Sequence, residues 1–234
     1  MSTGVFVTGT DTSVGKTLAA CALLRALGGT GMTVSGYKPV AAGAELVDGF
    51  LRNDDAVWLQ HCSSTRPEYD EVNPVVLEAA IAPHIAAHDA AVELDLGRLV
   101  AAHQRLADKS DFVVTEGAGG WLVPLGDGLQ FSDLAVALDV PVILVVGMRL
   151  GCLNHALLTA ESIAGHGARL GGWIANTLEP GMTALAENLA TLERGLAAPL
   201  IGSIPWLENR SMEERIDKAR SVMNLDLFLQ APRN

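Results

Sequence analysis

The stretch that decides the fold runs from residue 6 to residue 18 and reads Phe6-Val7-Thr8-Gly9-Thr10-Asp11-Thr12-Ser13-Val14-Gly15-Lys16-Thr17-Leu18. Its apolar, β-branched beginning predicts a buried strand. A glycine-containing turn follows, and from Gly15 onward the leucines recur with helical spacing. A strand, a turn and a helix in this order predict a phosphate-binding loop, in which backbone amides and the positive end of the helix dipole face an anion.

Two side chains of this loop are suited to a nucleotide. Lys16 is placed to reach the outer phosphates, and the Thr17 hydroxyl can coordinate Mg²⁺. The spacing is irregular, because five residues separate Gly9 from Gly15 where the usual motif has about four. The strand before the loop and the helix after it keep the context of the motif, so we interpret the longer loop as the mark of a subfamily.

The composition and net charge of the chain indicate which classes of partner it is suited to bind. The 234 residues are 49% apolar and carry a formal net charge of −11, which disfavours a nucleic acid or an anionic membrane as partner. The beginning of the chain lacks the pattern of a secretory signal, and the longest apolar run, residues 140–146, is too short to span a bilayer. Cys21, Cys62 and Cys152 form no C-x-x-C pair. We therefore expect a soluble, cytoplasmic protein.

Strand and helix patterns alternate along the chain. Further strands are predicted at residues 33–37, 112–115, 140–146, 170–175 and 199–204. Helices are predicted at 17–27, 95–107, 132–138, 151–164, 183–196 and around 213–218, and a further one carries Ala56, Leu59 and Gln60. Residues 67–83 have an irregular pattern. The alternation predicts an α/β fold with a mainly parallel sheet covered by helices on both faces, and a single domain over residues 1–234.

Several polar residues stand where these strands end. Glu116 follows the strand at 112–115 and begins a glycine-rich run; it is interpreted either as a magnesium carboxylate or as part of a plain turn. Asp54 or Asp55 either caps a helix or supplies a carboxylate to a metal. Asn176 either reads a purine edge or caps a turn. His84 and His88 are four residues apart, but no ligand cluster accompanies them, so we expect no metal there.

With these residues in view, the chain resembles the dethiobiotin synthetase family, whose fold is of the P-loop NTPase type. The resemblance is spread in order over residues 9–207, and its motifs together are specific. They are Gly9-Thr10-Asp11-Thr12, Val14-Gly15-Lys16-Thr17, Gly36-Tyr37-Lys38-Pro39-Val40, Arg52-Asn53, Asp55-Ala56, Val72-Asn73-Pro74, Pro83-His84-Ile85, Glu116-Gly117-Ala118-Gly119-Gly120-Trp121, Pro141 to Gly147, Leu150-Gly151-Cys152, Asn154-His155-Ala156, Gly172-Trp173, Ala175-Asn176 and Ile204-Pro205-Trp206-Leu207.

The resemblance implies an ATP- and Mg²⁺-dependent ring closure. 7,8-Diaminononanoate takes up CO₂ to give a carbamate, ATP phosphorylates the carbamate to a carbamic–phosphoric anhydride, and the second amine closes the ring of dethiobiotin. It also implies a homodimer whose substrate site is completed across the interface. Catalysis of this kind rests on positioning and electrostatics.

The resemblance also implies a role for each matching residue. Lys16, Lys38 and Thr12 are implied to be catalytic, and Thr17, Asp55 and Glu116 to hold Mg²⁺. The nucleotide is implied to contact Ser13, Val14, Gly15, Lys16, Thr17, Leu18, Asp55, Glu116, Gly117, Ala118, Gly119, Asn176, Thr177, Pro205, Trp206 and Leu207. The substrate is implied to contact Thr12, Lys38, Ala42 and, from a second subunit, Leu150, Gly151, Cys152 and Asn154.

The chain departs from the family pattern at two positions, since Ser13 stands where an acidic residue is frequent and Ala42 where a serine is frequent. Past Leu207, a glutamate that contacts the nucleotide is not assigned among Glu208, Glu213 and Glu214. The rival class is the partitioning or septum-placing switch ATPase, which carries a lysine five positions before the loop lysine. This chain has Asp11 there, so we prefer the biosynthetic enzyme.

Overall fold

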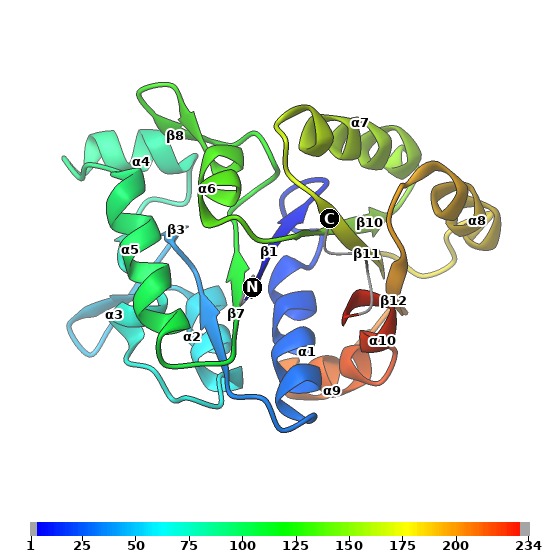
Figure 1. The fold of residues 1–234 in the computed structure, drawn as a ribbon, viewed down its shortest axis with the longest axis horizontal. Helices are drawn as coiled ribbons and strands as arrows, with labels where there is room; N and C mark the ends of the chain where they lie inside the picture. Colours follow the sequence, from blue (N-terminus) through cyan, green and yellow to red (C-terminus); the bar gives the residue numbers. More distant parts are fainter. Residues whose placement is uncertain (1–3, 230–234) are drawn as a thin grey trace.

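The computed structural model describes residues 4–229. Its centre is a six-stranded, fully parallel sheet in which the strand that carries the phosphate loop lies near the middle (Figure 1). In order across the sheet the strands are β12 (Leu200–Ile204), β11 (Leu170–Thr177), β10 (Val142–Met148), β1 (Gly4–Gly9), β7 (Phe112–Glu116) and β2 (Val34–Tyr37). The predicted α/β fold with a mainly parallel sheet is confirmed.

Ten helices surround the sheet within the described residues. They are α1 (Lys16–Gly28), α2 (Asp54–Cys62), α3 (Tyr69–Val72), α4 (Pro83–Asp89), α5 (Leu96–Ala107), α6 (Phe131–Leu138), α7 (Cys152–Gly165), α8 (Leu185–Gly195), α9 (Met212–Arg220) and α10 (Leu225–Leu229). The seven predicted helices correspond to α1, α2, α5, α6, α7, α8 and α9. α3, α4 and α10 were not predicted.

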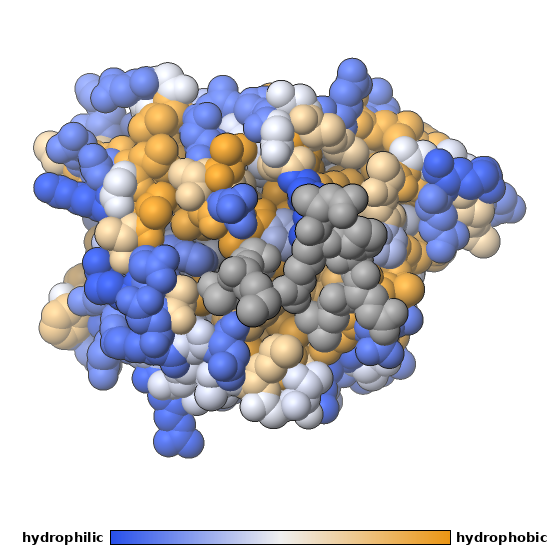
Figure 2. Space-filling view, in the orientation of Figure 1, coloured by the Kyte–Doolittle hydropathy of each residue, from blue (hydrophilic) through white to orange (hydrophobic). Residues whose placement is uncertain are grey.

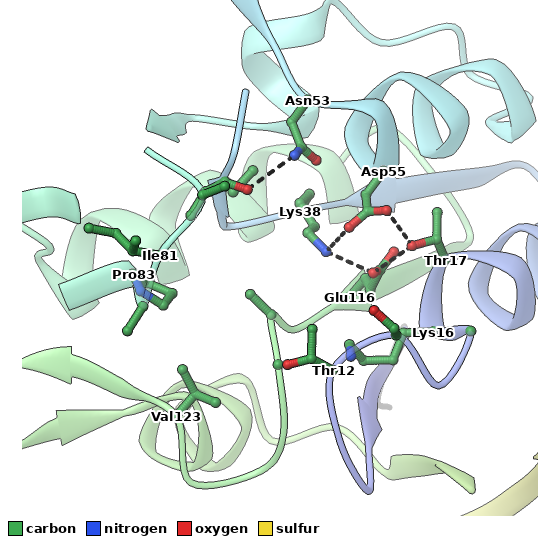
Figure 3. A pocket seen from close by; sticks show the side chains of 18 residues that line it. Thr12, Lys16, Thr17, Lys38, Asn53, Asp55, Ile81, Pro83, Glu116 and Val123 are labelled. Atoms are coloured by element: carbon green, nitrogen blue, oxygen red, sulfur yellow. Dashed lines mark hydrogen bonds and ion pairs between the residues drawn. The ribbon is translucent and has the colours of Figure 1, made fainter. Parts of the chain in front are cut away.

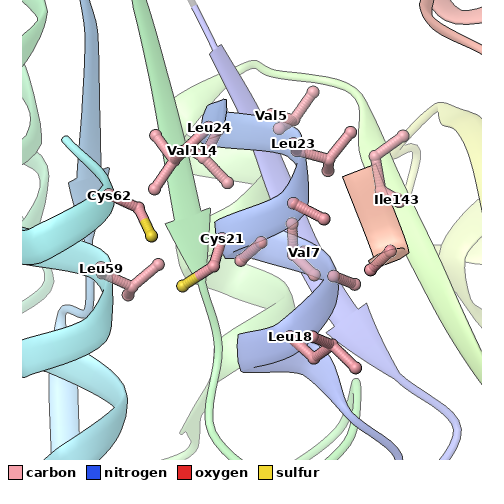
Figure 4. Close-up of a cluster of buried hydrophobic side chains, with 14 of the residues drawn as sticks. Val5, Val7, Leu18, Cys21, Leu23, Leu24, Leu59, Cys62, Val114 and Ile143 are labelled. Atoms are coloured by element: carbon pink, nitrogen blue, oxygen red, sulfur yellow. The ribbon is translucent and has the colours of Figure 1, made fainter. Parts of the chain in front are cut away.

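Alternate residues of each strand pack on opposite faces of the sheet, because side chains in a strand point to the two sides in turn. Val5 and Val7 of β1 lie in the core beneath α1, α2 and α9, whereas Phe6 packs on the other face beside Trp121 and Phe131. Figure 4 shows part of the first core, with the α1 and α2 side chains meeting those of the strands. The helices therefore cover both faces, as the apolar strand patterns predict.

Three two-stranded ribbons were not predicted. β3 (Val40–Ala42) pairs with β6 (Val75–Leu77) in parallel, and two antiparallel hairpins pair β4 (Glu45–Val47) with β5 (Phe50–Arg52) and β8 (Pro124–Gly126) with β9 (Leu129–Gln130). No element was predicted in residues 67–83, where the pattern is irregular, and this segment holds α3, β6 and the start of α4. These strands have three residues or fewer, too short for a periodic signal.

The surface is mixed in polarity. On the face shown in Figure 2, hydrophilic side chains are spread around the outline and apolar ones lie between them. Among residues 4–229, none of the helices has the length and apolar character needed to cross a membrane.

One buried histidine gives the fold a pH dependence. His103 of α5 is 5% exposed, its Nε2 lacks a hydrogen-bond partner in the described part of the chain, and its ring packs against Tyr37 with centroids 5.8 Å apart. Burial lowers the pKa of His103 from 6.5 to about 4. Between pH 4 and pH 6.5, this histidine is protonated in the unfolded chain and neutral in the folded chain. The free energy of unfolding therefore falls as pH drops from 6.5 toward 4.

We expect this group to cost about 3 kcal/mol of stability across that interval. The variant His103→Leu should lose this part of the acid sensitivity, which denaturant unfolding at pH 7 and at pH 4.5 measures. His155→Leu, at an exposed position of α7, is the matched control and should keep the wild-type pH dependence. If the free energy of unfolding fell by the same amount between pH 7 and pH 4.5 in both variants, His103 would not be the source of the acid sensitivity.

Candidate active site

The candidate site is a cavity of about 670 Å³ at the carboxyl ends of β1, β7 and β2 (Figure 3). In an open parallel sheet this edge is where ligands bind. The cavity wall comes from the phosphate loop, the end of β2, the start of α2, the glycine-rich run after β7, and the segment before α4. Its lining residues are Thr12, Ser13, Gly15, Lys16, Thr17, Lys38, Ala41, Ala42, Asn53, Asp55, Ala80, Ile81, Ala82, Pro83, Glu116, Ala118, Gly119 and Val123.

The phosphate loop is held in shape by the neighbouring strand. Gly15 precedes α1 with φ of 90°, in the left-handed region that favours glycine. A Cβ at this position would come within 2.2 Å of the Asn176 amide nitrogen. That nitrogen donates to the Val14 carbonyl at 2.8 Å. Only glycine fits the turn, and Asn176 at the end of β11 fixes it from outside.

Four side chains meet at the start of α1. The Lys38 ammonium lies 2.8 Å from Asp55 Oδ2 and 2.7 Å from Glu116 Oε1. The Thr17 hydroxyl donates to Asp55 Oδ1 at 2.6 Å, and lies 3.0 Å from Glu116 Oε1. Because Lys38 is 2% exposed and Glu116 is fully buried, these charges interact largely free of solvent screening.

The pKa values of the two lysines in the cavity are shifted in opposite directions. Burial alone would lower the pKa of Lys38, but the carboxylates of Glu116 and Asp55 outweigh it and raise that pKa. Burial opposes ionisation of Asp55, yet the Lys38 ammonium holds the pKa of Asp55 below its usual value. Burial lowers the pKa of Lys16 to about 8. Lys38 therefore remains an ammonium at neutral pH, while Lys16 is the cation that loses its proton more easily.

The donor atoms suit a magnesium ion. The hydroxyl of Thr17 and the carboxylates of Asp55 and Glu116 converge, and hard oxygen ligands are those that Mg²⁺ prefers. The second carboxylate oxygen of Glu116, Oε2, is buried without a hydrogen-bond partner among residues 4–229. An unpaired buried oxygen of this kind is ready for a cation. The residues present therefore fit the metal that the resemblance implies.

The choice between Asp54 and Asp55 is decided by where their side chains lie. The residue that precedes α2 is Asn53, and no side chain caps this helix. The cap interpretation is therefore wrong for both aspartates. Asp54 is exposed, whereas Asp55 faces Thr17 and Lys38. For Asn176, the amide donates to the Val14 carbonyl in the turn of the phosphate loop, which agrees with the turn-cap interpretation. The contact to a purine edge stays a prediction.

A second group of residues positions Lys38 and had no role in the sequence analysis. The Lys38 amide donates to the Val72 carbonyl at 2.7 Å, and the Asn73 side chain donates to the Lys38 carbonyl at 2.7 Å. The Tyr69 hydroxyl links Asn73 to the amide of Asn53 at the start of α2. The motif Val72-Asn73-Pro74 was the signal that could have found them.

The cavity gathers only part of the predicted set. Val14 and Leu18 are buried in the core beneath α1. Gly117 meets the site only through its carbonyl, 3.3 Å from Lys38 Nζ. Ala41, Asn53, Ala80, Ile81, Ala82, Pro83 and Val123 line the cavity although no site role was predicted for them. The apolar positions among them carry no chemical signal in a sequence. Asn53 and Pro83 stand in the motifs Arg52-Asn53 and Pro83-His84-Ile85, which were the signal that could have found them.

The predicted substrate segment of the second subunit lies outside this cavity. Gly151 precedes α7, Leu150 is 98% exposed and Asn154 is exposed. Cys152, in contrast, is 2% exposed and packs in the core with Ala156 and Trp173. Its thiol is therefore part of the core of this chain.

The residues predicted to contact adenine are also absent from the lining of this cavity. Thr177 ends β11, and Pro205, Trp206 and Leu207 follow β12. Of the three glutamates left unassigned as a nucleotide contact, two form contacts within the chain. Glu213 pairs with Arg25 and His61, and Glu214 caps α9 through Ser211. Glu208 is left as the glutamate of that set with an exposed position next to Leu207.

The fold and the site together define a P-loop nucleotide-binding protein. In agreement, the AAA domain family model matches residues 3–214. The chain also superposes on a ParA family ATPase from Chlorobium tepidum with a TM-score of 0.56 at 15% identity, covering 100% of this chain and 95% of that one. The septum site-determining protein MinD from Pyrococcus horikoshii, solved with Mg-ADP, gives 0.54 at 19% identity, with 98% and 90% covered. At these identities the likeness establishes the fold.

Sequence relatives define the family. The chain is 52% identical over 200 residues to the ATP-dependent dethiobiotin synthetase BioD of Aromatoleum aromaticum, covering 86% of this chain and 89% of that protein. It is 51% identical over 204 residues to BioD of Pseudomonas aeruginosa PAO1, with 87% and 90% covered. The chain belongs to the ATP-dependent dethiobiotin synthetase family. It is accordingly an ATP-dependent ligase of biotin biosynthesis.

Proposed function

We propose that the chain carboxylates 7,8-diaminononanoate and closes it to dethiobiotin at the cavity between the phosphate loop and α4. The observation that carries this proposal is the Lys38 ammonium, buried beside Thr17, Asp55 and Glu116 in one cavity with Lys16. Two cations next to a helix N-terminus are what the transfer of a phosphoryl group between two anions needs.

Each step balances with these residues in place. An amine nitrogen bonds to CO₂ and loses a proton, giving a carbamate. A carbamate oxygen attacks the γ-phosphorus of ATP and ADP leaves. The second amine then bonds to the carbamoyl carbon and loses a proton, phosphate leaves with the C–O bond electrons, and the ring is closed. Lys16 and Lys38 stabilise the negative charge that the phosphoryl group and the carbamate carry.

Thr17, Asp55 and Glu116 are proposed to hold Mg²⁺, which supplies charge stabilisation at the phosphate oxygens. Asn176, Thr177, Pro205, Trp206 and Leu207 are proposed for the base and Ser13 to Leu18 for the phosphates. The substrate then lies toward Thr12, Lys38 and Ala42. The aliphatic chain of a diaminononanoate suits the apolar wall formed by Ile81, Pro83 and Val123.

The acting form is proposed to be a cytoplasmic homodimer of one domain per chain, residues 1–234, with no nucleic acid or membrane as partner. The net charge of −11 and three free cysteines support this. The exposed leucines at and after the start of α7 (Leu150, Leu157 and Leu158) support a protein contact there. Residues 1–3 and 230–234 lie outside the described residues.

The proposal is tested by mixing the protein with Mg²⁺, ATP, bicarbonate and 7,8-diaminononanoate. We expect phosphate release that requires the diamine, and a product heavier than the diamine by CO₂ minus water. A rate of phosphate release that does not depend on the diamine, and that increases with DNA or lipid vesicles, would instead support the switch ATPase class.

A further inference from the structure

We propose that Arg149 is a positioning residue for the nucleotide: it neutralises Asp11 and holds the first half of the phosphate loop. Arg149 lies in the turn that follows β10, far along the sequence from this loop. Its guanidinium donates to Asp11 Oδ2. The inference rests on the proposed placement of the ATP phosphates on the Gly15–Thr17 turn.

Asp11 is the residue through which this contact reaches the loop. Its Oδ1 accepts a hydrogen bond from the Thr12 amide at 2.8 Å, and its carbonyl accepts one from Lys16 Nζ at 3.1 Å. The Asp11 side chain therefore orients one loop amide, and its backbone holds the ammonium that the phosphates require. A change in the position of Asp11 would move both groups.

The ion pair extends an anchorage that the backbone begins. The Thr10 amide donates to the Val145 carbonyl of β10 at 3.0 Å, and the Gly147 amide lies 3.4 Å from the Thr10 hydroxyl. The turn that bears Arg149 is closed by a hydrogen bond from the Cys152 amide to the Arg149 carbonyl at 3.0 Å. β10 and its turn thus hold the front of the loop, while Asn176 of β11 holds its rear.

The charge of the pair is as important as its geometry. The cavity already contains the carboxylates of Asp55 and Glu116, and Lys38 is bound to both of them. A bare Asp11 carboxylate in the loop would add repulsion for a polyphosphate. Arg149 cancels that charge. Since the two side chains are 43% and 46% exposed, solvent screening keeps the effect moderate.

The test compares Mg-ADP dissociation constants, measured by isothermal titration calorimetry, for four variants. Arg149→Gln should raise the Kd about five- to tenfold, because it exposes the Asp11 charge. Asp11→Asn keeps the oxygen that accepts from Thr12 and should change the Kd by about twofold at most. The double variant should bind more tightly than Arg149→Gln alone. Arg149→Lys, which keeps the charge, should restore affinity to within about twofold of wild type.

Arg194→Gln on the exposed side of α8 is the matched control for loss of one positive charge, and should leave the Kd unchanged. An Arg149→Gln variant with wild-type affinity, or a double variant no better than it, would overturn the inference. Failure of the proposed nucleotide site itself gives a different result, since Lys16→Ala would then bind Mg-ADP as tightly as wild type.

Discussion

Replacing Lys38 by alanine is expected to lower kcat about a thousandfold. The Lys38 ammonium is buried in the cavity, and it contacts both proposed metal carboxylates. Without it the negative charge that develops on the carbamate and the phosphoryl group has no fixed partner on this side of the site. The measurement is diamine-dependent phosphate release at saturating ATP and bicarbonate.

The loss of Lys38 should spare the fold. Burial already raises the pKa of Glu116, so this carboxyl can take up a proton when its ammonium partner is removed. Circular dichroism and the Tm of the variant measure whether it remains folded. Lys38→Met is a second variant, which keeps most of the side-chain volume. Lys109→Ala, which removes a half-exposed surface lysine paired with Glu71, is the control and should retain full kcat. A folded Lys38 variant within tenfold of wild-type kcat would remove Lys38 from the mechanism.

Replacing Asp55 by asparagine is expected to lower kcat about a hundredfold and to raise the Mg²⁺ concentration needed for half-maximal activity. Asparagine keeps the shape and an acceptor for the Thr17 hydroxyl but loses the charge that a divalent cation requires. The fold should be unaffected, since Asp55 caps no helix. The measurement is kcat against Mg²⁺ concentration at fixed ATP.

Asp54→Asn is the closest control that the chain offers. Asp54 precedes Asp55 in the same first turn of α2, and it is exposed. Both substitutions remove one negative charge from the same helix end, so their effects on the helix dipole are matched. Equal Mg²⁺ requirements in the two variants would show that Asp55 holds no metal.

Local patterns were sufficient for part of the site. The strand, turn and helix of residues 6–18 are contiguous, so their periodicity and their glycine predict the loop without any distant contact. Glu116 was predicted from its place after an apolar strand, and Lys38 from the proline that follows it. Both were found in the cavity because parallel strands end at one edge of the sheet.

Other features could not be read from local patterns. Asp54 and Asp55 have the same chemistry, and only the packing of α2 against α1 turns the second toward Thr17. The short ribbons and the apolar wall around Ile81 have no period long enough to detect. The pairing of Arg149 with Asp11 joins residues that only the parallel pairing of β1 with β10 brings together.

The sequence by itself determined the α/β class, the phosphate loop and the family, since these depend on periodicity and on motifs that are contiguous in the chain. Only the tertiary structure decided which aspartate enters the site, what Asn176 holds and how Arg149 reaches the loop. The physical reason is that a side chain's role depends on which neighbours the fold brings within hydrogen-bonding distance, and for these residues the neighbours come from distant parts of the chain.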